Sequence, residues 1–376
     1  MSRTQPSTGA LTSLESALAA LLDGLAPVAP SLLPLDDALG RVAAEMPPLT
    51  HALPACNIAM ADGWAFRALD LAGASAYSPL PLMAAPAWVE AGQAMPEGCD
   101  CVLDAGLVEC SGPMAQALAE AFPGQCVRRA GEDMGAGRPV AMAGKRIAAA
   151  DLLVARAAGV DELAVRSPRL RVIDVAAPAK ESFTSRFIVE SAKASGATVG
   201  GIETVTRDAT SIARALDNAA CDLIVLIGGT GAGRTDATAE ALGARGALIA
   251  HNIALQPGRT AATGRLGDTP VVALPGAPTQ AFAAFLALVQ PVLDRLSGRT
   301  ARRSTVLPLT RKISSTVGLA EIVLLKQEQN GWTPLAVGDF SLDAMRSADA
   351  WLAIAGGSEG YAAGTPVGAI PLRDFT

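Results

Sequence analysis

Residues 169–296 alternate short apolar runs with segments of helical periodicity, and this alternation constrains the fold more than any other feature of the sequence. The apolar runs predict strands at 169–176, 197–202, 222–227, 247–255 and 270–274. The segments between and after them predict helices at 184–195, 208–219, 236–243 and 278–296, the last with Pro278 at its first helical position. Strands that alternate with helices form a parallel sheet with helices on both faces. We therefore predict a three-layer α/β domain over 169–299.

A glycine-rich turn follows the third of these strands, in the stretch LIVLIGGTGAGRTDATAEAL at 223–242. It differs from the phosphate-binding signature G-x-x-x-x-G-K-[ST] at one position, where Arg234 replaces the lysine. In an open α/β sheet such a turn lies at the carboxyl edge, where ligands bind, and its backbone N–H groups can hold a phosphate without lysine. We therefore predict a phosphate-binding turn. The alternatives are an ATPase loop and a turn whose glycines serve packing alone.

The regions on either side of this domain do not show this strand–helix alternation. The capping-box pattern of Thr12 and Glu15 predicts a helix over 13–24, and helical periodicity returns at 149–158. We assign 1–50 and 130–168 to a helical linking domain. Short apolar pieces broken by proline and glycine predict a β-rich domain over 51–129 and a second β module over 300–376.

Composition excludes several classes of protein. The chain has a net charge of −6 and no lysine or arginine tract, which argues against a nucleic-acid or anionic-membrane partner. Its six cysteines contain no C-x-x-C pair and it has two histidines, so a zinc site is not expected. The amino-terminal segment lacks the basic region of a signal peptide, and no apolar run is long enough to span a membrane. We predict a cytoplasmic protein with reduced thiols.

Polar residues and turn formers recur in five stretches whose order and spacing carry a family resemblance. They are AMADGWAFR (59–67), GQAMPEGCDCVL (92–103), RRAGEDMGAGRPV (128–140), GGTGAGRTD (228–236) and LQPGRTAATGRLGDTPVVALPGAP (255–278). Together they resemble the molybdopterin molybdenumtransferase family, the molybdate-inserting enzymes related to the gephyrin E domain. The resemblance covers roughly residues 10–376.

This resemblance implies a fold, a reaction and partners. The fold is a helical and β-rich amino-terminal half, an α/β molybdopterin-binding domain and a carboxyl-terminal β barrel, in a subunit of a homodimer. The reaction takes adenylylated molybdopterin and molybdate, needs Mg²⁺, releases AMP and leaves molybdenum on the dithiolene. The implied partners are a molybdopterin adenylyltransferase and apo-molybdoenzymes or their chaperones.

The resemblance also assigns roles to individual residues. The implied catalytic residues are Asp62, Asp133, Asp236 and Arg259, of which Asp236 and Asp62 are also the implied Mg²⁺ ligands. The implied pterin and phosphate contacts are Gly228, Gly229, Thr230, Gly231, Gly233, Arg129, Glu132, Pro275 and Gly276. The structural alternatives are a turn at Asp62, a solvated charge run at 129–133 and a helix cap at Asp236.

The chain departs from the family pattern at several charged positions. The family's T-G-D-E, whose carboxylate is expected at the metal, is replaced by AAPAKESF at 176–183. Its K-P-G-K-P becomes Gln256-Pro-Gly-Arg259-Thr, and its L-P-G-N-P ends in Ala277-Pro278. Mg²⁺ would then depend on Asp236 and the substrate phosphates, with Asp62 or Glu181 as substitutes. Such losses slow an electrostatically stabilised reaction by orders of magnitude. Three functions therefore stay open: an insertase, a non-catalytic molybdopterin-binding protein and an adenylyltransferase-like enzyme.

Overall fold

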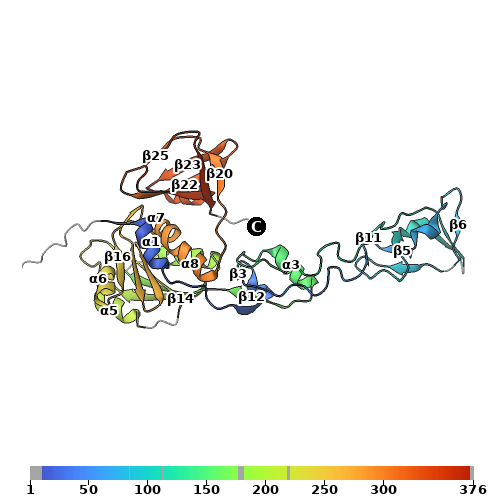
Figure 1. Ribbon diagram of the computed structural model, residues 1–376, viewed down its shortest axis with the longest axis horizontal. Coiled ribbons are helices and arrows are strands. Elements are labelled where there is room, and N and C mark those ends of the chain that lie inside the picture. Colours follow the sequence, from blue (N-terminus) through green and yellow to red (C-terminus); the bar gives the residue numbers. More distant parts are fainter. Residues whose placement is uncertain (1–10, 84, 112–113, 177–181, 218–220, 373–376) are drawn as a thin grey trace, which may run out of the picture. The chain divides into compact units, whose positions relative to one another are not determined.

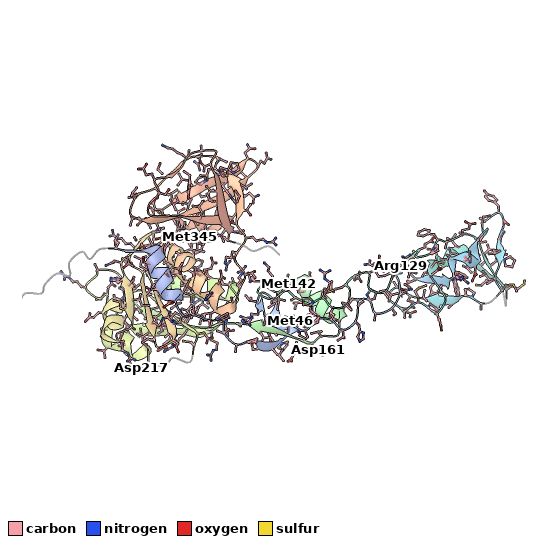
Figure 2. The ribbon with its side chains drawn as sticks, in the orientation of Figure 1. Met46, Arg129, Met142, Asp161, Asp217 and Met345 are labelled. Atoms are coloured by element: carbon pink, nitrogen blue, oxygen red, sulfur yellow. The ribbon has the colours of Figure 1, made fainter. Side chains whose placement is uncertain are left out.

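The computed structural model describes residues 11–83, 85–111, 114–176, 182–217 and 221–372 (Figure 1). The chain divides into two compact units. The first unit comprises the chain up to Glu45, Ala143–Ala148 and the chain from Glu162 onward; the second comprises Met46–Met142 and Ala149–Asp161. Figure 2 labels Met46, Met142 and Asp161, which end segments of the second unit. A search of the described residues finds no helix both long and apolar enough to cross a membrane.

A six-stranded sheet forms the centre of the first unit. Its strands, in spatial order, are β14 (Thr198–Thr206), β13 (Arg169–Ala176), β15 (Leu223–Ile227), β19 (Thr269–Leu274), β18 (Ala262–Leu266) and β16 (Leu248–His251). The first four are parallel, as predicted. The prediction is wrong at the other edge, where β18 and β16 are antiparallel. The unpredicted β18 forms a hairpin with β19 through Gly267 and Asp268, because a two-residue turn suffices for antiparallel neighbours.

Helices cover both faces of this sheet, which confirms the three-layer prediction (Figure 1). They are α1 (Leu14–Leu22), α4 (Phe183–Ala194), α5 (Ala209–Ala215), α6 (Thr238–Ala244), α7 (Pro278–Ala284), the π-helical η3 (Phe285–Val289) and α8 (Gln290–Ser297). Side chains of α1, α4, α7, η3 and α8 share one core with Val225 and Ile227, and those of α5 and α6 share the other with Ile224 and Leu226. Successive side chains of a strand point to opposite faces, so a strand covered on both sides is apolar throughout.

Two of the predicted helices differ from the structure for identifiable physical reasons. The cap of α1 is Ser13, whose Oγ accepts a hydrogen bond from Ser16 N at 3.1 Å. The predicted cap Thr12 is wrong because this residue pairs with Ile253 in a short parallel strand, β1 (Thr12–Ser13). The predicted helix over 278–296 forms, but it contains a π-helical turn just before Pro291, a residue that has no N–H group to bond the preceding turn.

A barrel of strands completes the first unit at its carboxyl end. Its elements are β17 (Ile253–Gln256), β20 (Thr305–Pro308), β21 (Ile313–Ser314), β22 (Ala320–Glu328), β23 (Gly331–Val337), α9 (Leu342–Ser347), β24 (Ala350–Ile354), β25 (Gly360–Tyr361) and β26 (Pro366–Pro371). Strands β23, β22, β24, β26 and β20 are paired in that order. Leu309 then bridges Trp332 of β23, and Trp332 Nε1 donates to Thr305 O at 3.1 Å, which closes the ring. The predicted β barrel is confirmed.

Strand β17 joins this barrel to the α/β domain. It lies in the chain between β16 and β18 of the α/β sheet, yet it pairs with β22 and with β1, both in parallel. Its residue Leu255 lies opposite Ala320, and both belong to the core that also holds α1 and α8.

A small sheet with its helix is also in this unit: β2 (Ser31–Pro34), β3 (Val42–Ala43), β12 (Glu162–Arg166) and α2 (Leu35–Ala38).

The second unit consists of short strands. They are β4 (Ile58–Ala59), β5 (Gly63–Phe66), β6 (Leu80–Pro81), β7 (Ala87–Val89), β8 (Cys101–Leu103), β9 (Val108–Ser111), β10 (Met114–Ala117) and β11 (Val127–Arg128), with η1 (Ala68–Leu71), η2 (Ala105–Leu107) and α3 (Ala149–Ala157). They form three small sheets, β6-β10-β9, β7-β5-β8 and β4-β11. Two small cores, centred on Leu71 and Val102, support them.

Candidate functional site

The glycine-rich turn after β15 is built so closely that its first two glycines cannot be replaced without strain. Gly228 and Gly229 have φ angles of +96° and +65°, which favour glycine. A Cβ on Gly228 would lie 2.9 Å from Val175 O, and one on Gly229 would lie 2.7 Å from Thr238 Oγ1. Thr238 Oγ1 donates to Gly228 O at 2.8 Å and Thr238 N donates to Gly229 O at 3.0 Å. The turn is thus held against the start of α6.

Asp236 closes the rest of the loop onto itself. Its Oδ2 accepts a hydrogen bond from Gly233 N at 3.0 Å, and a Cβ on Gly231 would come within 2.7 Å of the same oxygen. Its Oδ1 lies 3.7 Å from the nearest guanidinium nitrogen of Arg207. The N-cap of α6 is Ala237, with no side-chain capping bond, so the helix-cap alternative for Asp236 is wrong. The carboxylate instead shapes the loop and faces a cation.

A cavity of about 210 Å³ opens at the carboxyl edge of the sheet beside this loop. Its lining comprises Asp174, Val175, Ala176, Ser182, Phe183, Thr184, Arg207, Ile227, Gly228, Gly276 and Pro278. These residues come from the ends of β13, β14, β15 and β19 and from the starts of α4 and α7. Open α/β sheets bind ligands at this edge, and the amino-terminal end of the twelve-residue α4 favours an anion.

Hydroxyl groups hold the walls of the cavity together. Thr184 Oγ1 donates to Gly276 O at 2.7 Å, which ties the start of α4 to the turn after β19. Ser182 caps α4 by accepting from Ser185 N at 3.3 Å. Pro275 is buried, and a Cβ on Gly276 would lie 3.5 Å from Gly228 Cα, so the two predicted turns touch.

The structure therefore brings together some of the predicted residues and adds others. Gly228 and Gly276 line the cavity, with Gly229, Gly231, Gly233 and Asp236 in the adjoining loop. Sequence reasoning missed Asp174, Ser182, Thr184 and Arg207. Each is near the carboxyl end of a parallel strand or the start of the helix after it, so the rule that located the glycine loop, applied to every strand end, would have found them.

Two further predicted residues do not line this cavity. Thr230 is buried, its carbonyl oxygen lies 2.9 Å from His251 Nε2, and its Oγ1 lies 3.3 Å from Thr260 Oγ1. Arg259 is exposed and lines a separate pocket of about 280 Å³ with Gln256 and Gln280. The end of β17 and the loop after it therefore line a separate pocket, to which Arg259 contributes a positive charge.

The predicted residues of the second unit form local contacts. Asp62 Oδ1 accepts from Ala91 N at 2.8 Å, which joins the turn before β5 to the turn after β7. Asp133 forms an ion pair with Arg128, and Glu132 Oε2 accepts from the backbone N–H of Arg129 at 2.8 Å. The exposed Arg129 is labelled in Figure 2. These carboxylates hold their own turns in shape.

The side chains at the glycine loop fit Mg²⁺ poorly. The described part of the chain has no group of three or more His, Cys, Asp or Glu side chains placed to hold a metal ion. Both oxygens of Asp236 have protein neighbours, namely Gly233 N–H and the Arg207 guanidinium. A Mg²⁺ ion on Oδ1 would be repelled by that guanidinium and needs near-octahedral oxygen ligands. The suggested substitute Glu181 lies outside the described residues.

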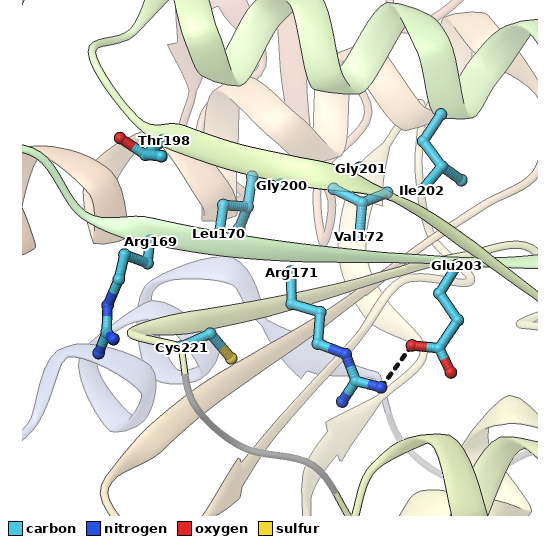
Figure 3. A pocket seen from close by; sticks show the side chains of 10 residues that line it. All are labelled: Arg169, Leu170, Arg171, Val172, Thr198, Gly200, Gly201, Ile202, Glu203 and Cys221. Carbon is cyan, nitrogen blue, oxygen red and sulfur yellow. Dashed lines mark hydrogen bonds and ion pairs between the residues drawn. The ribbon is translucent and has the colours of Figure 1, made fainter.

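A larger pocket, of about 500 Å³, lies along the amino-terminal halves of β13 and β14 (Figure 3). Its charges are paired: Arg171 with Glu203, and Arg169 with Asp222. Burial raises the pKa of the Cys221 thiol, which keeps the sulfur protonated and poorly nucleophilic. Because parallel sheets bind ligands at the opposite edge, we place the functional site at the smaller cavity.

Comparison with known proteins gives matches along most of the chain. Residues 12–159 match the family model described as "MoeA N-terminal region (domain I and II)", and residues 179–295 match "Probable molybdopterin binding domain". Molybdopterin molybdenumtransferase 2 of Mycobacterium tuberculosis is 28% identical over 370 residues, which cover 87% of this chain and 90% of that protein. Molybdopterin molybdenumtransferase of Synechococcus elongatus is 27% identical over 84% of this chain and 88% of that protein. The crystal structure of a molybdopterin biosynthesis MoeA protein from Pyrococcus horikoshii superposes with a TM-score of 0.70 and 25% identity, over 97% of this chain and 100% of that one.

Proposed function

Because the chain belongs to the MoeA family of molybdopterin molybdenumtransferases, we propose that it inserts molybdate into adenylylated molybdopterin and releases AMP. Membership of the family makes the chain a transferase of molybdenum cofactor biosynthesis. The cavity at the carboxyl edge of the sheet carries the finer proposal. It combines a glycine loop, hydroxyl groups and a guanidinium, which suit a phosphorylated substrate.

The residues of this cavity have separate tasks in the proposed reaction. The start of α4 presents N–H dipoles to a phosphate, as helix starts do in other phosphate sites. The N–H of Gly228 donates to Leu274 O at 2.9 Å, so this glycine shapes the wall of the cavity. Arg207 neutralises negative charge, and Asp236 keeps the loop and that guanidinium in place. The buried carboxylate of Asp174 can accept from the amino group of a pterin. Positioning and electrostatics of this kind supply most of the catalysis in phosphate chemistry.

One assay tests this proposal against its alternatives. Purified protein is incubated with adenylylated molybdopterin, with and without molybdate, and AMP is followed over time. AMP release that depends on molybdate supports the insertase. Binding of the pterin without molybdate-dependent AMP release would replace the insertase by a non-catalytic binding protein. Adenylylation of molybdopterin at the expense of ATP would favour the adenylyltransferase-like activity.

Several features of the proposal concern conditions and partners. The homodimer, the Mg²⁺ requirement of the overall transfer and the cytoplasmic location stay predictions. The same holds for a molybdopterin adenylyltransferase and apo-molybdoenzymes or their chaperones as partners. Repeating the AMP assay in EDTA and after Mg²⁺ is restored tests the metal requirement directly.

A further inference from the structure

Arg207 lines the cavity and has a hydrogen-bond donor that no described residue satisfies. It follows the last residue of β14, and 27% of its side chain is exposed. One of its terminal nitrogens lies 3.7 Å from Asp236 Oδ1, which is an ion pair but too long for a hydrogen bond. Its Nε is buried and has no hydrogen-bond partner among the described residues. A guanidinium presents five N–H donors in a planar fork, so this one has donor capacity left for a ligand.

The surroundings of Arg207 select the kind of ligand that it would bind. The cavity is lined by the hydroxyl-bearing Ser182 and Thr184 and by Gly228 and Gly276 as well as by Arg207. Its volume of about 210 Å³ is below the roughly 300–1,000 Å³ of sites that enclose a whole drug-sized ligand. It therefore suits a small charged group. Arginine forks match the oxygens of tetrahedral oxyanions with two parallel hydrogen bonds.

The same geometry explains why a guanidinium, rather than a metal ion, suits this position. A carboxylate that binds Mg²⁺ needs an oxygen free to face the ion, whereas the two oxygens of Asp236 face Gly233 N–H and Arg207. We propose that Arg207 binds a tetrahedral oxyanion, either a phosphate group or molybdate, in this cavity without a divalent cation. Asp236 is then a positioning residue that orients Arg207. The identity of the ion as part of the substrate rests on the proposed function, whereas the binding of the ion does not.

Equilibrium dialysis tests the proposal on the full-length protein. Molybdate and inorganic phosphate are each titrated in the presence of EDTA and again with Mg²⁺, and bound molybdenum or phosphorus is measured. We expect millimolar or tighter binding that is the same in EDTA and in Mg²⁺. A preference for molybdate assigns the cavity to the incoming oxyanion, and a preference for phosphate assigns it to the substrate phosphate; both outcomes support the proposal.

Three variants separate this proposal from a metal-bridged site. Arg207→Gln should weaken binding about tenfold or more, because hydrogen bonds between charged groups are lost, and Arg207→Lys should recover part of it. Asp236→Asn should bind the free ion at least as well as the parent, since the loss of a negative charge beside the guanidinium outweighs the looser orientation of Arg207. That orientation matters for the alignment of the transfer step and not for capture of the ion. A metal bridge through Asp236 predicts the opposite for that variant. The matched control is Arg245→Gln, which makes the same charge change at the far end of α6, where Arg245 pairs with Asp217.

Clear results would overturn the proposal. They are a strict need for Mg²⁺, equal affinity of Arg207→Gln and the parent, weakened binding by Asp236→Asn, or no binding of either ion by the parent protein. Circular dichroism and melting temperature of each variant identify a loss of fold, and Arg207→Lys then decides the outcome. The AMP assay is run in parallel. Molybdate-dependent AMP release by a parent protein that fails the dialysis test would refute this inference and leave the insertase standing.

Discussion

Replacing Gly228 by alanine is expected to displace the glycine loop and slow the proposed transfer. A residue other than glycine at its φ of +96° pays about 1–2 kcal/mol for a left-handed conformation. The added Cβ would also lie 2.9 Å from Val175 O, which belongs to the central strand β13 and cannot yield. Overpacking of this kind costs about 1–3 kcal/mol. Together these terms predict a local loss of about 2–5 kcal/mol, relieved by movement of the loop.

Two measurements on this variant check the reasoning. Hydrogen exchange of the peptide that contains β15 and the loop should become faster by a factor that corresponds to this local loss. Molybdate-dependent AMP release should fall by about a hundredfold, since a displacement near 1 Å at a reacting site has that effect. The control is Gly243→Ala in α6, where a Cβ meets nothing within 4 Å; it should stabilise the helix by about 0.5–1 kcal/mol. Unchanged exchange and rate in Gly228→Ala would refute the reasoning.

Three further predictions concern charge and assembly. Asp236→Asn should lower molybdate-dependent AMP release by at least about a hundredfold while pterin binding persists, because the loop backbone is intact but the charge that orients Arg207 is gone; an unchanged rate would contradict this. Hydrogen bonds from Thr206 Oγ1 and Ser211 N lower the pKa of Asp208 from 3.8 to about 2. A carboxylate whose pKa is lowered in the folded state stabilises the fold at pH values above its unfolded pKa, and this stabilisation is lost as the pH falls from about 4 towards 2. The difference in melting temperature between the parent and Asp208→Ala should therefore shrink over that pH interval. A difference that does not change with pH would be inconsistent with this prediction. Light scattering at micromolar concentration should give the mass of a dimer, and a monomer mass would count against the homodimer.

The sequence was a good guide to the α/β domain because two kinds of signal are local. The apolar run LIVLI at 223–227 requires burial on both faces, which is what β15 has. The glycines after it require positive φ angles, and Gly228 and Gly229 have them. By contrast, Gly267 and Asp268 form the two-residue turn between β18 and β19, and this hairpin signal is weak because β18, with the sequence ATGRL, is not an apolar run.

The cavity was harder to predict because its residues come together only when the spatial order of the strands in the sheet is known. Arg207 follows β14 and faces Asp236, which lies beyond the end of β15, although β13 separates the two strands in the sheet. Strand order is a tertiary property that apolar periodicity does not encode. The role of Asp236 was equally hard to predict, because its partner Arg207 is brought to it by the same strand order. Its place before α6 suggested a helix cap, and the family resemblance implied a metal ligand, whereas its partners are Gly233 N–H and a guanidinium.

Strand β17 has a consequence for attempts to divide the protein. A fragment ending near residue 299 would contain the whole α/β sheet but would expose the backbone of Leu255 and Gln256, whose pairing partners Ala320 and Glu321 are in β22. It would also uncover the apolar core that Trp351 and Ile322 share with α8. An unpaired edge beside uncovered apolar surface promotes aggregation. The α/β domain and the barrel should therefore be expressed as one piece and should melt in one cooperative transition.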